Sequence, residues 1–386
     1  MTERLYYTDA TLTEFTARVV EAAGDRVYLD RTAFYPTSGG QLFDTGVLGD
    51  ARIVDVVDEG ERIAHVLDKP GRLAAGADVT GRIDWTRRFD HMQQHTGQHL
   101  LSAVFEELFG HKTISVHFGD ESATLDLDAT SLSRDRALKA EHRANEIVLE
   151  RRAVTVTFED SSTATGLRKA VDRTGELRIV EIAGIDRSAC GGTHVANTAE
   201  IGAVTVRRIE KYKQGTRVEF ICGWRALARA RADFDALSAM AVSLTAAIDE
   251  LPALVAAQAA HRKEAETVAR KLGEELAGYR ARERYDATAP RADGIRLVEE
   301  TAQTMDPLRA MAQAMSALPK VVYLGSVVAP PGIVFAASAD SGVNAGEALK
   351  TALSANGGRG GGSPRVAQGT VPDAAALQRV LAALGG

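Results

Sequence analysis

The sequence has few cysteines and no long apolar segment. Only two of its 386 residues are cysteines, Cys190 and Cys222, so we expect no disulfide framework and a reducing compartment. No uninterrupted apolar run approaches the roughly 18 residues that suggest a membrane-spanning helix, and the N-terminal residues lack the apolar region of a signal peptide. These features predict a cytoplasmic protein without a membrane segment.

An excess of positive charge is also missing. The chain has 46 Lys and Arg residues against 52 Asp and Glu residues, which gives a formal net charge of −6. Because phosphate attraction acts through nearby Lys and Arg side chains, a nucleic-acid-binding role would require a local basic surface. The hydrophobic share of 45% is that of an ordinary folded protein, and the length allows two to three domains of roughly 100–200 residues each.

Hydrophobic patterns predict an α+β protein that begins with a small β-barrel or sandwich. Residues 1–85 contain short β-branched runs such as Ile53–Val57, separated by glycine and aspartate. Residues 86–223 mix strand patterns with helical patterns over Asp90–Leu108 and Arg134–Arg151. We expect this second part to be a mixed α/β domain.

Residues 224–288 are predicted to form a helical arm. Ala, Glu and Arg dominate this segment, and apolar residues from Phe234 to Val255 recur at the alternating three- and four-residue spacing of a coiled-coil seam. Pro252 lies inside the seam and should start a second helix or kink the first. The seam fits an intramolecular helix pair and a homodimer equally well.

Residues 289–386 alternate strand and helix patterns and predict a small α/β domain. We expect Asp306 to cap a helix with Pro307 at its first position, and Asn344 to begin another helix. No internal repeat is visible in the sequence.

Two histidines and a Cys–His pair form the strongest chemical signal. His95 and His99 are four residues apart on a predicted helix, so both imidazoles face the same side. Cys190 and His194 bracket Gly191-Gly192, which allows a tight turn. Three nitrogens and one sulfur form a tetrahedral donor set that suits zinc, and we predict one Zn²⁺ per chain.

The four-ligand set leaves the role of the metal open. A saturated tetrahedral zinc is usually structural, whereas a catalytic zinc keeps an open position. Either one ligand is loosely held, or the metal positions the substrate. His91 lies one helical turn before His95 and could be an extra ligand or a partner of one, but we expect it to be exposed. Cys222 follows Ile221 in a strand-like run and is expected in the core.

A glycine-rich turn is the third motif. Gly39 and Gly40 can bring backbone amides close to a ligand, and Thr37, Ser38 and Gln41 supply hydrogen-bonding groups beside them. By composition alone, an ordinary hairpin turn explains this segment. Its functional interpretation rests on the motifs that accompany it.

These three motifs, in this order, resemble the editing region of alanyl-tRNA synthetase. They are still more similar to its free-standing relatives, the alanyl-tRNA editing proteins of the AlaX family in their long form. The matching segments are FYPTSGGQLFDTG (34–46), RFDHMQQHTGQHLLSAVF (88–105), ACGGTHVANTAEIG (189–202) and YKQGTRVEF (212–220). GGRGGGSPRVAQG (357–369) resembles the glycine-rich motif of the DHH-associated domain that ends alanyl-tRNA synthetases.

The resemblance implies a deacylase that hydrolyses mischarged tRNA(Ala) in trans, without charging tRNA and without ATP. Ser-tRNA(Ala) would be the chief substrate, with Gly-tRNA(Ala) left open as a second. The zinc ligands of the family map onto His95, His99, Cys190 and His194. The residues that would line the aminoacyl pocket are Thr37, Ser38, Gly39, Gly40 and Gln41. Thr37 is the first candidate for contact with the serine hydroxyl and Gln41 the second, and the general base stays unknown.

The C-terminal glycines carry a further prediction. Gly357–Gly362 and the nearby Arg359 and Arg365 are expected to form a flexible, locally basic loop that contacts the tRNA backbone. The alternative is a disordered linker. A homodimer through the helical arm or through this domain is also left open.

Three other functions compete with the deacylase hypothesis. Editing domains of threonyl-tRNA synthetases carry a related pair of metal motifs and act on Ser-tRNA(Thr), but the FYPTSGGQ motif and the C-terminal domain favour tRNA(Ala). A non-catalytic tRNA-binding or scaffold protein with a structural zinc fits the four ligands and the arm. The C-terminal domain also suggests a DHH-type phosphoesterase, but the Asp-rich half of that group is absent from the sequence.

Overall fold

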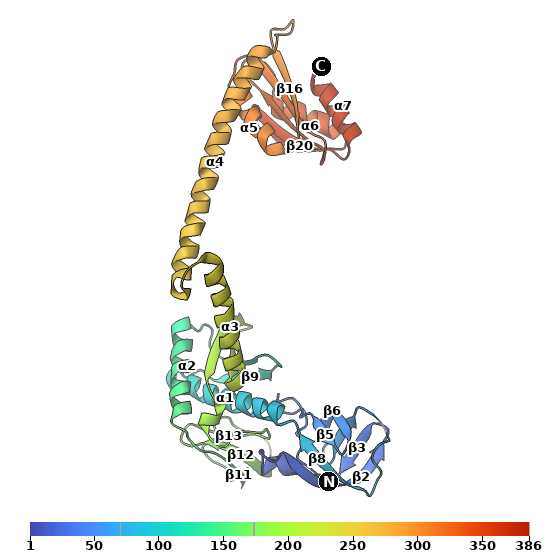
Figure 1. Cartoon of the computed structure of the whole chain (residues 1–386), viewed down its shortest axis with the longest axis vertical. Coiled ribbons are helices and arrows are strands. Elements are labelled where there is room, and N and C mark those ends of the chain that lie inside the picture. Colours follow the sequence, from blue (N-terminus) through green and yellow to red (C-terminus); the bar gives the residue numbers. More distant parts are fainter. Residues whose placement is uncertain (70, 173, 386) are drawn as a thin grey trace. The chain divides into compact units, whose positions relative to one another are not determined.

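The computed structural model describes residues 1–69, 71–172 and 174–385 (Figure 1). These residues form two compact units, Met1–Met240 and Ala241–Gly386. Helices and strands are mixed in both units, as the predicted α+β class requires.

Six antiparallel strands of the first unit close into a barrel in the order β2-β3-β7-β6-β5-β8. In that order the strands are Glu14–Ala23, Arg26–Leu29, Ile63–Leu67, Ala51–Asp58, Gly46–Leu48 and Asp78–Ile83. In β2 the side chains of Phe15, Ala17 and Val19 are buried while their neighbours are exposed, which is the period-two pattern of a strand with one buried face. The prediction of a barrel within residues 1–85 is confirmed.

A short N-terminal segment lies beside the barrel. Strand β1 (Glu3–Arg4) pairs in parallel with β4 (Arg31–Thr32), and the 3-10 helix η1 (Leu5–Tyr7) follows directly. The aromatic ring of Tyr6 packs edge-on against that of Tyr35, with 5.2 Å between the ring centroids.

Helices α1 and α2 pack on a four-stranded antiparallel sheet with the order β14-β15-β10-β9. The strands are Val204–Tyr212, Gly215–Cys222, Ala123–Leu127 and Thr113–Phe118, and the helices are Trp85–Phe109 and Arg134–Leu149. Leu100, Leu101 and Val104 of α1 are completely buried in the shared core. Helix α1 begins earlier than predicted because Asp84 caps it by accepting the backbone N–H of Arg87.

A second, three-stranded antiparallel sheet leads into the Cys–His segment. Its order is β11-β12-β13, with the strands Val154–Asp160, Glu176–Ile182 and Asp186–Ala189. The 3-10 helix η2 (Thr198–Ile201) ends the segment, and its first residues are capped by the side chain of Asn197. Residues 190–197 are therefore fixed between a strand and a capped turn.

The predicted helical arm is split into two helices. Helix α3 (Gly223–Leu244) ends at Thr245, whose backbone adopts a positive φ of 51°. After η3 (Ile248–Glu250), helix α4 runs over Leu251–Ala287 with Pro252 in its first turn, as the proline predicted. The apolar seam from Phe234 to Val255 is thus divided between α3 and α4.

The second unit is built on a five-stranded sheet with the order β16-β17-β18-β20-β19. The strands are Arg296–Ala302, Val321–Val327, Gly332–Ala337, Val366–Thr370 and Arg359–Gly362, and the helices are α5 (Met305–Ser316), α6 (Ala345–Ala355) and α7 (Ala374–Gly385). Strands β16 and β17 are parallel, and the other pairs are antiparallel. Helices α4 and α5 share one hydrophobic core with the sheet, and α6 and α7 share another.

Two local predictions for this unit are wrong. Thr304, not Asp306, precedes α5, so Asp306 and Pro307 lie inside its first turn. Residues Gly357–Gly362 are not a flexible loop, because Arg359–Gly362 form the edge strand β19. A Cβ atom on Gly360 would lie 2.4 Å from the carbonyl oxygen of Gln368, so the glycine allows the two strands to approach. The predicted N-cap at Asn344 is confirmed, since its side chain accepts the N–H of Glu347.

No single helix in the described part of the chain is long and apolar enough to span a membrane. Helices α3 and α4 meet the length and composition criteria only when they are taken together.

Candidate metal centre

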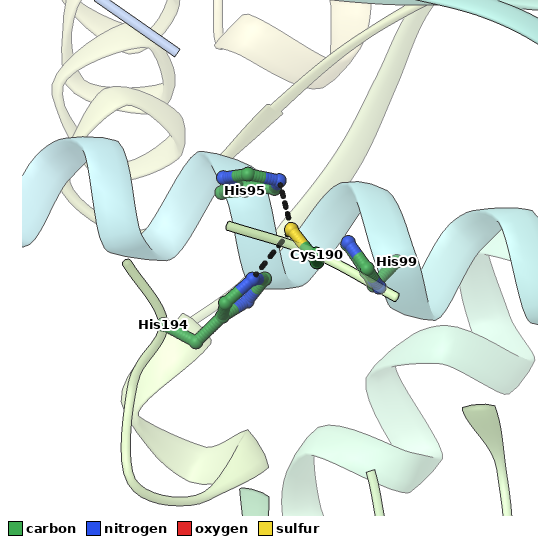
Figure 2. Close-up of side chains that lie close together, drawn as sticks. All are labelled: His95, His99, Cys190 and His194. Atoms are coloured by element: carbon green, nitrogen blue, oxygen red, sulfur yellow. Dashed lines mark hydrogen bonds between the residues drawn. The ribbon is translucent and has the colours of Figure 1, made fainter. Parts of the chain in front are cut away.

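The structure brings the four predicted metal ligands together. His95 and His99 project from one face of α1, and Cys190 and His194 come from the segment after β13 (Figure 2). One donor atom from each residue lies within 4.8 Å of the others. The Cys190 Sγ is 3.3 Å from His95 Nε2 and 3.4 Å from His194 Nε2. Tetrahedral zinc would separate N and S donors by roughly 3.6 Å, so the cluster is close to metal-binding geometry.

Two of the three imidazoles are oriented by oxygen atoms behind them. His95 Nδ1 lies 2.8 Å from Gln41 Oε1. His194 Nδ1 lies 3.1 Å from the hydroxyl of Thr96, which itself donates to the Met92 carbonyl and so presents an acceptor to the ring. An Nδ1–H held by an oxygen leaves the Nε2 lone pair free. Both rings therefore direct Nε2 toward the sulfur of Cys190.

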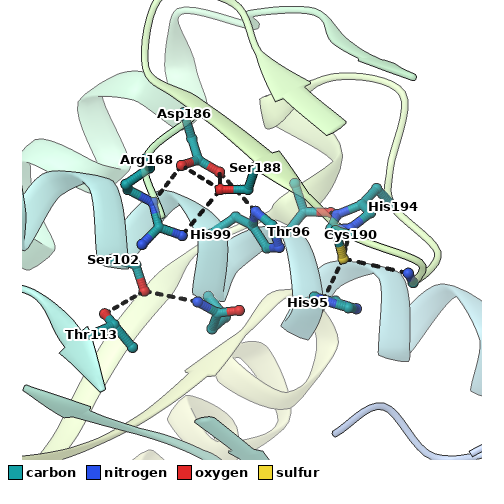
Figure 3. Close-up of polar contacts among 12 residues, drawn as sticks. His95, Thr96, His99, Ser102, Thr113, Arg168, Asp186, Ser188, Cys190 and His194 are labelled. Atoms are coloured by element: carbon teal, nitrogen blue, oxygen red, sulfur yellow. Dashed lines mark hydrogen bonds and ion pairs between the residues drawn. The ribbon is translucent and has the colours of Figure 1, made fainter. Parts of the chain in front are cut away.

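The third imidazole is held by a carboxylate. His99 Nδ1 lies 2.7 Å from Asp186 Oδ2, and Asp186 is fixed in turn by hydrogen bonds from Arg168 and Ser188 (Figure 3). The Asp186 side chain is completely buried. A carboxylate behind a histidine ligand is the usual support for a bound metal ion, so this network fits a metal centre better than an accidental histidine pair.

The electrostatics of the cluster favour a deprotonated sulfur. Burial alone would raise the pKa of Cys190, but the charges and hydrogen bonds of His95 and His194 outweigh it and bring the pKa well below the ordinary value. Burial and the nearby His95 lower the pKa of His194 to about 3. Burial alone would lower the pKa of His99, but the Asp186 carboxylate and Cys190 raise it to about 9. A thiolate is the sulfur donor that a divalent metal requires, and metal binding would displace the proton from His99.

Two glycines are necessary for this arrangement. A Cβ atom on Gly192 would lie 2.1 Å from His95 Cε1, so only glycine lets the Cys–His segment pass this close to the ring. A Cβ atom on Gly97 would lie 2.3 Å from the Sγ of Cys222. Cys222 is completely buried, as predicted from its place in a strand. The packing of α1 against β15 thus depends on Gly97.

The glycine-rich turn lies next to the cluster. Ser38 and Gln41 exchange two backbone hydrogen bonds of 3.0 Å, and Gly39 and Gly40 between them have positive φ values of 57° and 86°, as a tight primed turn requires. Thr37, Ser38, Gly39 and Gly40 are exposed, whereas Gln41 is buried. A Cβ atom on Gly40 would be 3.3 Å from the Phe118 ring, whose centroid is 5.1 Å from that of His95.

The side chain of Gln41 connects this turn to both metal-binding segments. Its Oε1 faces His95 Nδ1 and also accepts the backbone N–H of Thr193 at 3.2 Å, while its Nε2 donates to the Thr193 hydroxyl at 2.8 Å. The amide oxygen is therefore already engaged within the protein. Sequence reasoning placed Gln41 near the substrate but did not foresee these contacts.

Several supporting residues were given no role by the sequence analysis. Arg88 and Asp44 form a completely buried ion pair that ties α1 to the chain after the glycine-rich turn. The Asp44 side chain also accepts the backbone N–H of Tyr35 at 2.6 Å. Asp186 is 87 positions from His99, and no spacing rule links residues so far apart. Only the folded chain identifies these partners.

His91 differs from the prediction. It is only 5% exposed, and burial lowers its pKa to about 4. Among the described residues, its Nδ1 has no hydrogen-bond partner. The expectation of an exposed residue is wrong because this part of α1 is covered by the surrounding structure, and His91 is not in the ligand cluster.

The two arginines predicted to contact tRNA lie in the second unit and differ from each other. Arg359 is exposed on the edge strand β19. Arg365 is partly buried, and its guanidinium donates to the carbonyl oxygen of Ser316. Arg359 is thus the freer of the two cations.

Three family models match separate parts of the chain. The model described as "tRNA synthetases class II (A)" matches residues 4–87, which include the barrel. "Threonyl and Alanyl tRNA synthetase second additional domain" matches residues 177–219, which include Cys190 and His194. The model "DHHA1 domain" matches residues 297–385 in the second unit.

Individual relatives of this chain are alanine–tRNA ligases and an alanyl-tRNA editing protein, in agreement with the three family models. An alanine–tRNA ligase from Pyrococcus abyssi is 33% identical over 96% of this chain and 42% of its own length. Another from Hyperthermus butylicus is 35% identical over 79% of this chain and 34% of its own length. The alanyl-tRNA editing protein AlaX-L from Pyrococcus horikoshii is 35% identical over 59% of this chain and 60% of its own length. The chain therefore spans less than half the length of the two ligases.

Proposed function

Since the chain belongs to the family of alanyl-tRNA synthetases and alanyl-tRNA editing proteins, we propose that it deacylates mischarged tRNA(Ala). The chief substrate is Ser-tRNA(Ala), with Gly-tRNA(Ala) as a second, and the ester is hydrolysed in trans on tRNA charged by another enzyme. The observation that carries the proposal is the cluster of three buried histidines, His95, His99 and His194, with the partly buried Cys190, beside the exposed Thr37–Gly40 turn.

The resident metal in this proposal is zinc, one ion per chain. The donor set of three imidazoles and one thiolate suits zinc. The three Nδ1 atoms are engaged by oxygen, and the Nε2 atoms and Sγ converge. When bound, zinc would supply positive charge that orients the ester end of the tRNA or polarises a water molecule.

Residues of the glycine-rich turn account for the choice of serine. The Thr37 hydroxyl accepts the backbone N–H of Phe43 at 3.1 Å. It donates to no other group in the described part of the chain, so its proton is available to a substrate hydroxyl. Thr37 is exposed beside Gly39 and Gly40, where a ligand can approach. A site that hydrogen-bonds a substrate hydroxyl rejects an analogue without one, because its polar group would lose a partner. Alanine would therefore be spared, and no general base is assigned.

The proposal divides the chain into four functional parts. Residues 1–85 would carry the pocket turn, 86–223 the metal centre, 224–288 a helical arm, and 289–386 a DHH-associated domain. Arg359 and Arg365 would contact the tRNA backbone, with Arg359 the stronger candidate because it is exposed. A homodimer through the arm or the C-terminal domain is part of the same hypothesis.

The test is deacylation of Ser-tRNA(Ala), Gly-tRNA(Ala) and Ala-tRNA(Ala) by the wild type, Thr37→Val and Cys190→Ala. We expect rapid loss of serine, sparing of alanine, and at least a 10-fold weaker serine preference in Thr37→Val. Cys190→Ala should lose both metal and activity. Preferential hydrolysis of Ser-tRNA(Thr) would instead assign Ser-tRNA(Thr) as the substrate.

One observation favours a second candidate, a non-catalytic tRNA-binding protein with a structural zinc. Four ligands saturate a tetrahedral site, and the three histidines are 4–5% exposed. A structural ion should be needed for folding, whereas a catalytic ion should be removable with the fold kept. Circular dichroism before and after chelation separates the two: collapse of the fold, together with absent hydrolysis by the loaded protein, would favour the scaffold.

A further inference from the structure

One arginine beside the metal centre has no carboxylate partner among the described residues. Arg178 lies on β12 and is partly buried. Among the described residues up to Met240, each of the other partly or fully buried arginines forms an ion pair with a carboxylate. Beside Arg178 the negative charge is instead the Cys190 thiolate, and a metal ion bound to Cys190 would take up that charge. A partly buried cation without a counter-ion is costly, so the metal-loaded site leaves Arg178 short of an anion.

The contacts of Arg178 place its guanidinium at the Cys190 end of the metal centre. Its Nη1 donates to the Cys190 carbonyl oxygen at 2.6 Å, and its Nε donates to the Tyr7 carbonyl oxygen at 3.0 Å. The guanidinium carbon lies 5.6 Å from the centroid of the Tyr7 ring. These bonds hold the planar group in one orientation. In the described part of the chain, its other terminal nitrogen, Nη2, has no hydrogen-bond partner.

The neighbouring Arg4 provides an internal comparison. Its guanidinium carbon also lies 5.6 Å from the Tyr7 centroid, and one of its nitrogens donates to the Tyr7 hydroxyl. Arg4, however, is neutralised by two hydrogen bonds of 2.8 Å to the Asp58 carboxylate. The Tyr7 ring thus contacts one paired arginine and one unpaired arginine, and only the unpaired one contacts a metal ligand.

The chemistry of the proposed substrate supplies an anion for Arg178. An aminoacyl ester has no free carboxylate, and its amino group is a cation, so its anionic groups are the phosphodiesters of the tRNA. The phosphate nearest the ester is the one on the terminal nucleotide, a single ribose away. Arginine presents paired N–H donors that match phosphate oxygens. A preoriented arginine beside the metal centre is suited to fix that phosphate while the ester lies at the metal.

We propose that Arg178 binds the phosphodiester of the 3′-terminal nucleotide and so positions the aminoacyl ester at the metal centre. This rests on the proposed function, because it names a substrate contact for the same site. It is a binding role, separate from holding Cys190 in place, although one hydrogen bond of Arg178 serves that second purpose.

Two substrates distinguish phosphate binding from a structural role. One is a seryl RNA minihelix with the tRNA(Ala) acceptor stem, and the other is 3′-O-seryl-adenosine, which carries no phosphate. The variants are Arg178→Gln, Arg178→Lys, and Arg187→Gln as the matched control. Arg187 is a partly buried arginine on the adjacent strand β13 that pairs with Glu159 and Glu181. Metal content is measured for every preparation.

We expect Arg178→Gln to lower the ratio of kcat/KM for the minihelix to that for seryl-adenosine by about 10- to 100-fold, as for loss of one charged hydrogen bond. The change should appear in KM, and Arg178→Lys should recover part of it. For the deacylated minihelix, the slope of log Kd against log salt should decrease by about 0.7, the value for one single-strand phosphate contact. Arg187→Gln should leave the ratio and the slope unchanged.

An unchanged ratio in Arg178→Gln would overturn the proposal. So would an equal loss on both substrates together with lower metal content, which would assign Arg178 to the support of Cys190. If the metal-loaded wild type hydrolyses neither substrate, the deacylase function fails. The salt slope with deacylated minihelix would still decide whether Arg178 contacts a phosphate.

Discussion

Two glycine-rich segments of this chain look alike in sequence but are needed for different contacts. Gly191-Gly192 lets a backbone segment pass the His95 imidazole within the metal centre. In Gly357–Gly362, by contrast, the close neighbours are backbone atoms of β20 and apolar side chains such as Leu353 and Val371, with no ionisable side chain among them. A glycine run thus indicates the close approach of another group, and the identity of that group determines the role of the glycines.

The largest effect is expected for Gly192→Ala. Its new Cβ would collide with the His95 ring at 2.1 Å, so the ring or the Cys–His segment must move. Loss of a ligand's support alone weakens metal binding about 10- to 100-fold, and displacing the ligand should cost at least about 100-fold. Gly191→Ala is the control, because its Cβ would meet only Tyr7 at 3.8 Å. Equal metal content in the two variants, measured by mass spectrometry of metals, would contradict the account.

A buried histidine outside the metal centre, His65, gives a prediction for the barrel. His65 lies inside the barrel, bonded to Thr32 and the Val27 carbonyl, and burial lowers its pKa from 6.5 to about 4. The unfolded chain then binds the proton first, so this contribution to stability is complete above pH 6.5 and is lost as the pH falls toward 4. The loss should reach about 3 kcal/mol, at 1.36 kcal/mol per pKa unit.

Urea unfolding of the wild type and His65→Gln at pH 7 and pH 4 measures this contribution. The difference between the two proteins removes the titration of all other groups. The wild type should lose about 3 kcal/mol more than the variant between the two pH values. Parallel losses would show that His65 does not bind its proton differently in the folded and unfolded states.

Asp186→Asn should weaken metal binding by about 10- to 100-fold, because His99 loses a charged partner while its own donor atom remains. Competition with a chromophoric chelator gives the metal Kd. Asp160→Asn is the control, since this carboxylate is exposed and bonds only within its own turn. An unchanged Kd in Asp186→Asn would mean that His99 is oriented by packing alone.

The smallest effect concerns the C-terminal glycines. Gly360→Ala should cost about 1–3 kcal/mol of stability by overpacking β19 against β20, and metal content should not change. Gly361→Ala should be neutral to within about 0.5 kcal/mol, because no atom lies within 4 Å of its Cβ position. Thermal unfolding of both variants checks this, and equal stability would contradict strand packing as the reason for Gly360.

The sequence predicted the four clustered residues because each pair is local. His95 and His99 are related by one helical turn, and Cys190 and His194 by one short segment. It also found the barrel, since alternating burial in strands such as β2 leaves a period of two.

The residues that support this cluster could not be predicted in this way. Asp186, Gln41 and Thr96 contact the histidines across 87, 54 and 98 positions of sequence. The prediction of a flexible loop at 357–362 was wrong because composition alone does not distinguish a flexible loop from a close-packed edge strand. Both the histidine contacts and the β19–β20 strand pairing join residues that no local sequence pattern relates.

The central claim is that the His95, His99, Cys190 and His194 cluster binds a metal ion that is needed to deacylate Ser-tRNA(Ala). Its most direct test follows metal content and Ser-tRNA(Ala) hydrolysis together during chelation and stepwise return of Zn²⁺. The account predicts that activity disappears with the ion, returns in proportion to it, and reaches its maximum at one ion per chain with the fold kept. Full activity in metal-free, folded protein would contradict it.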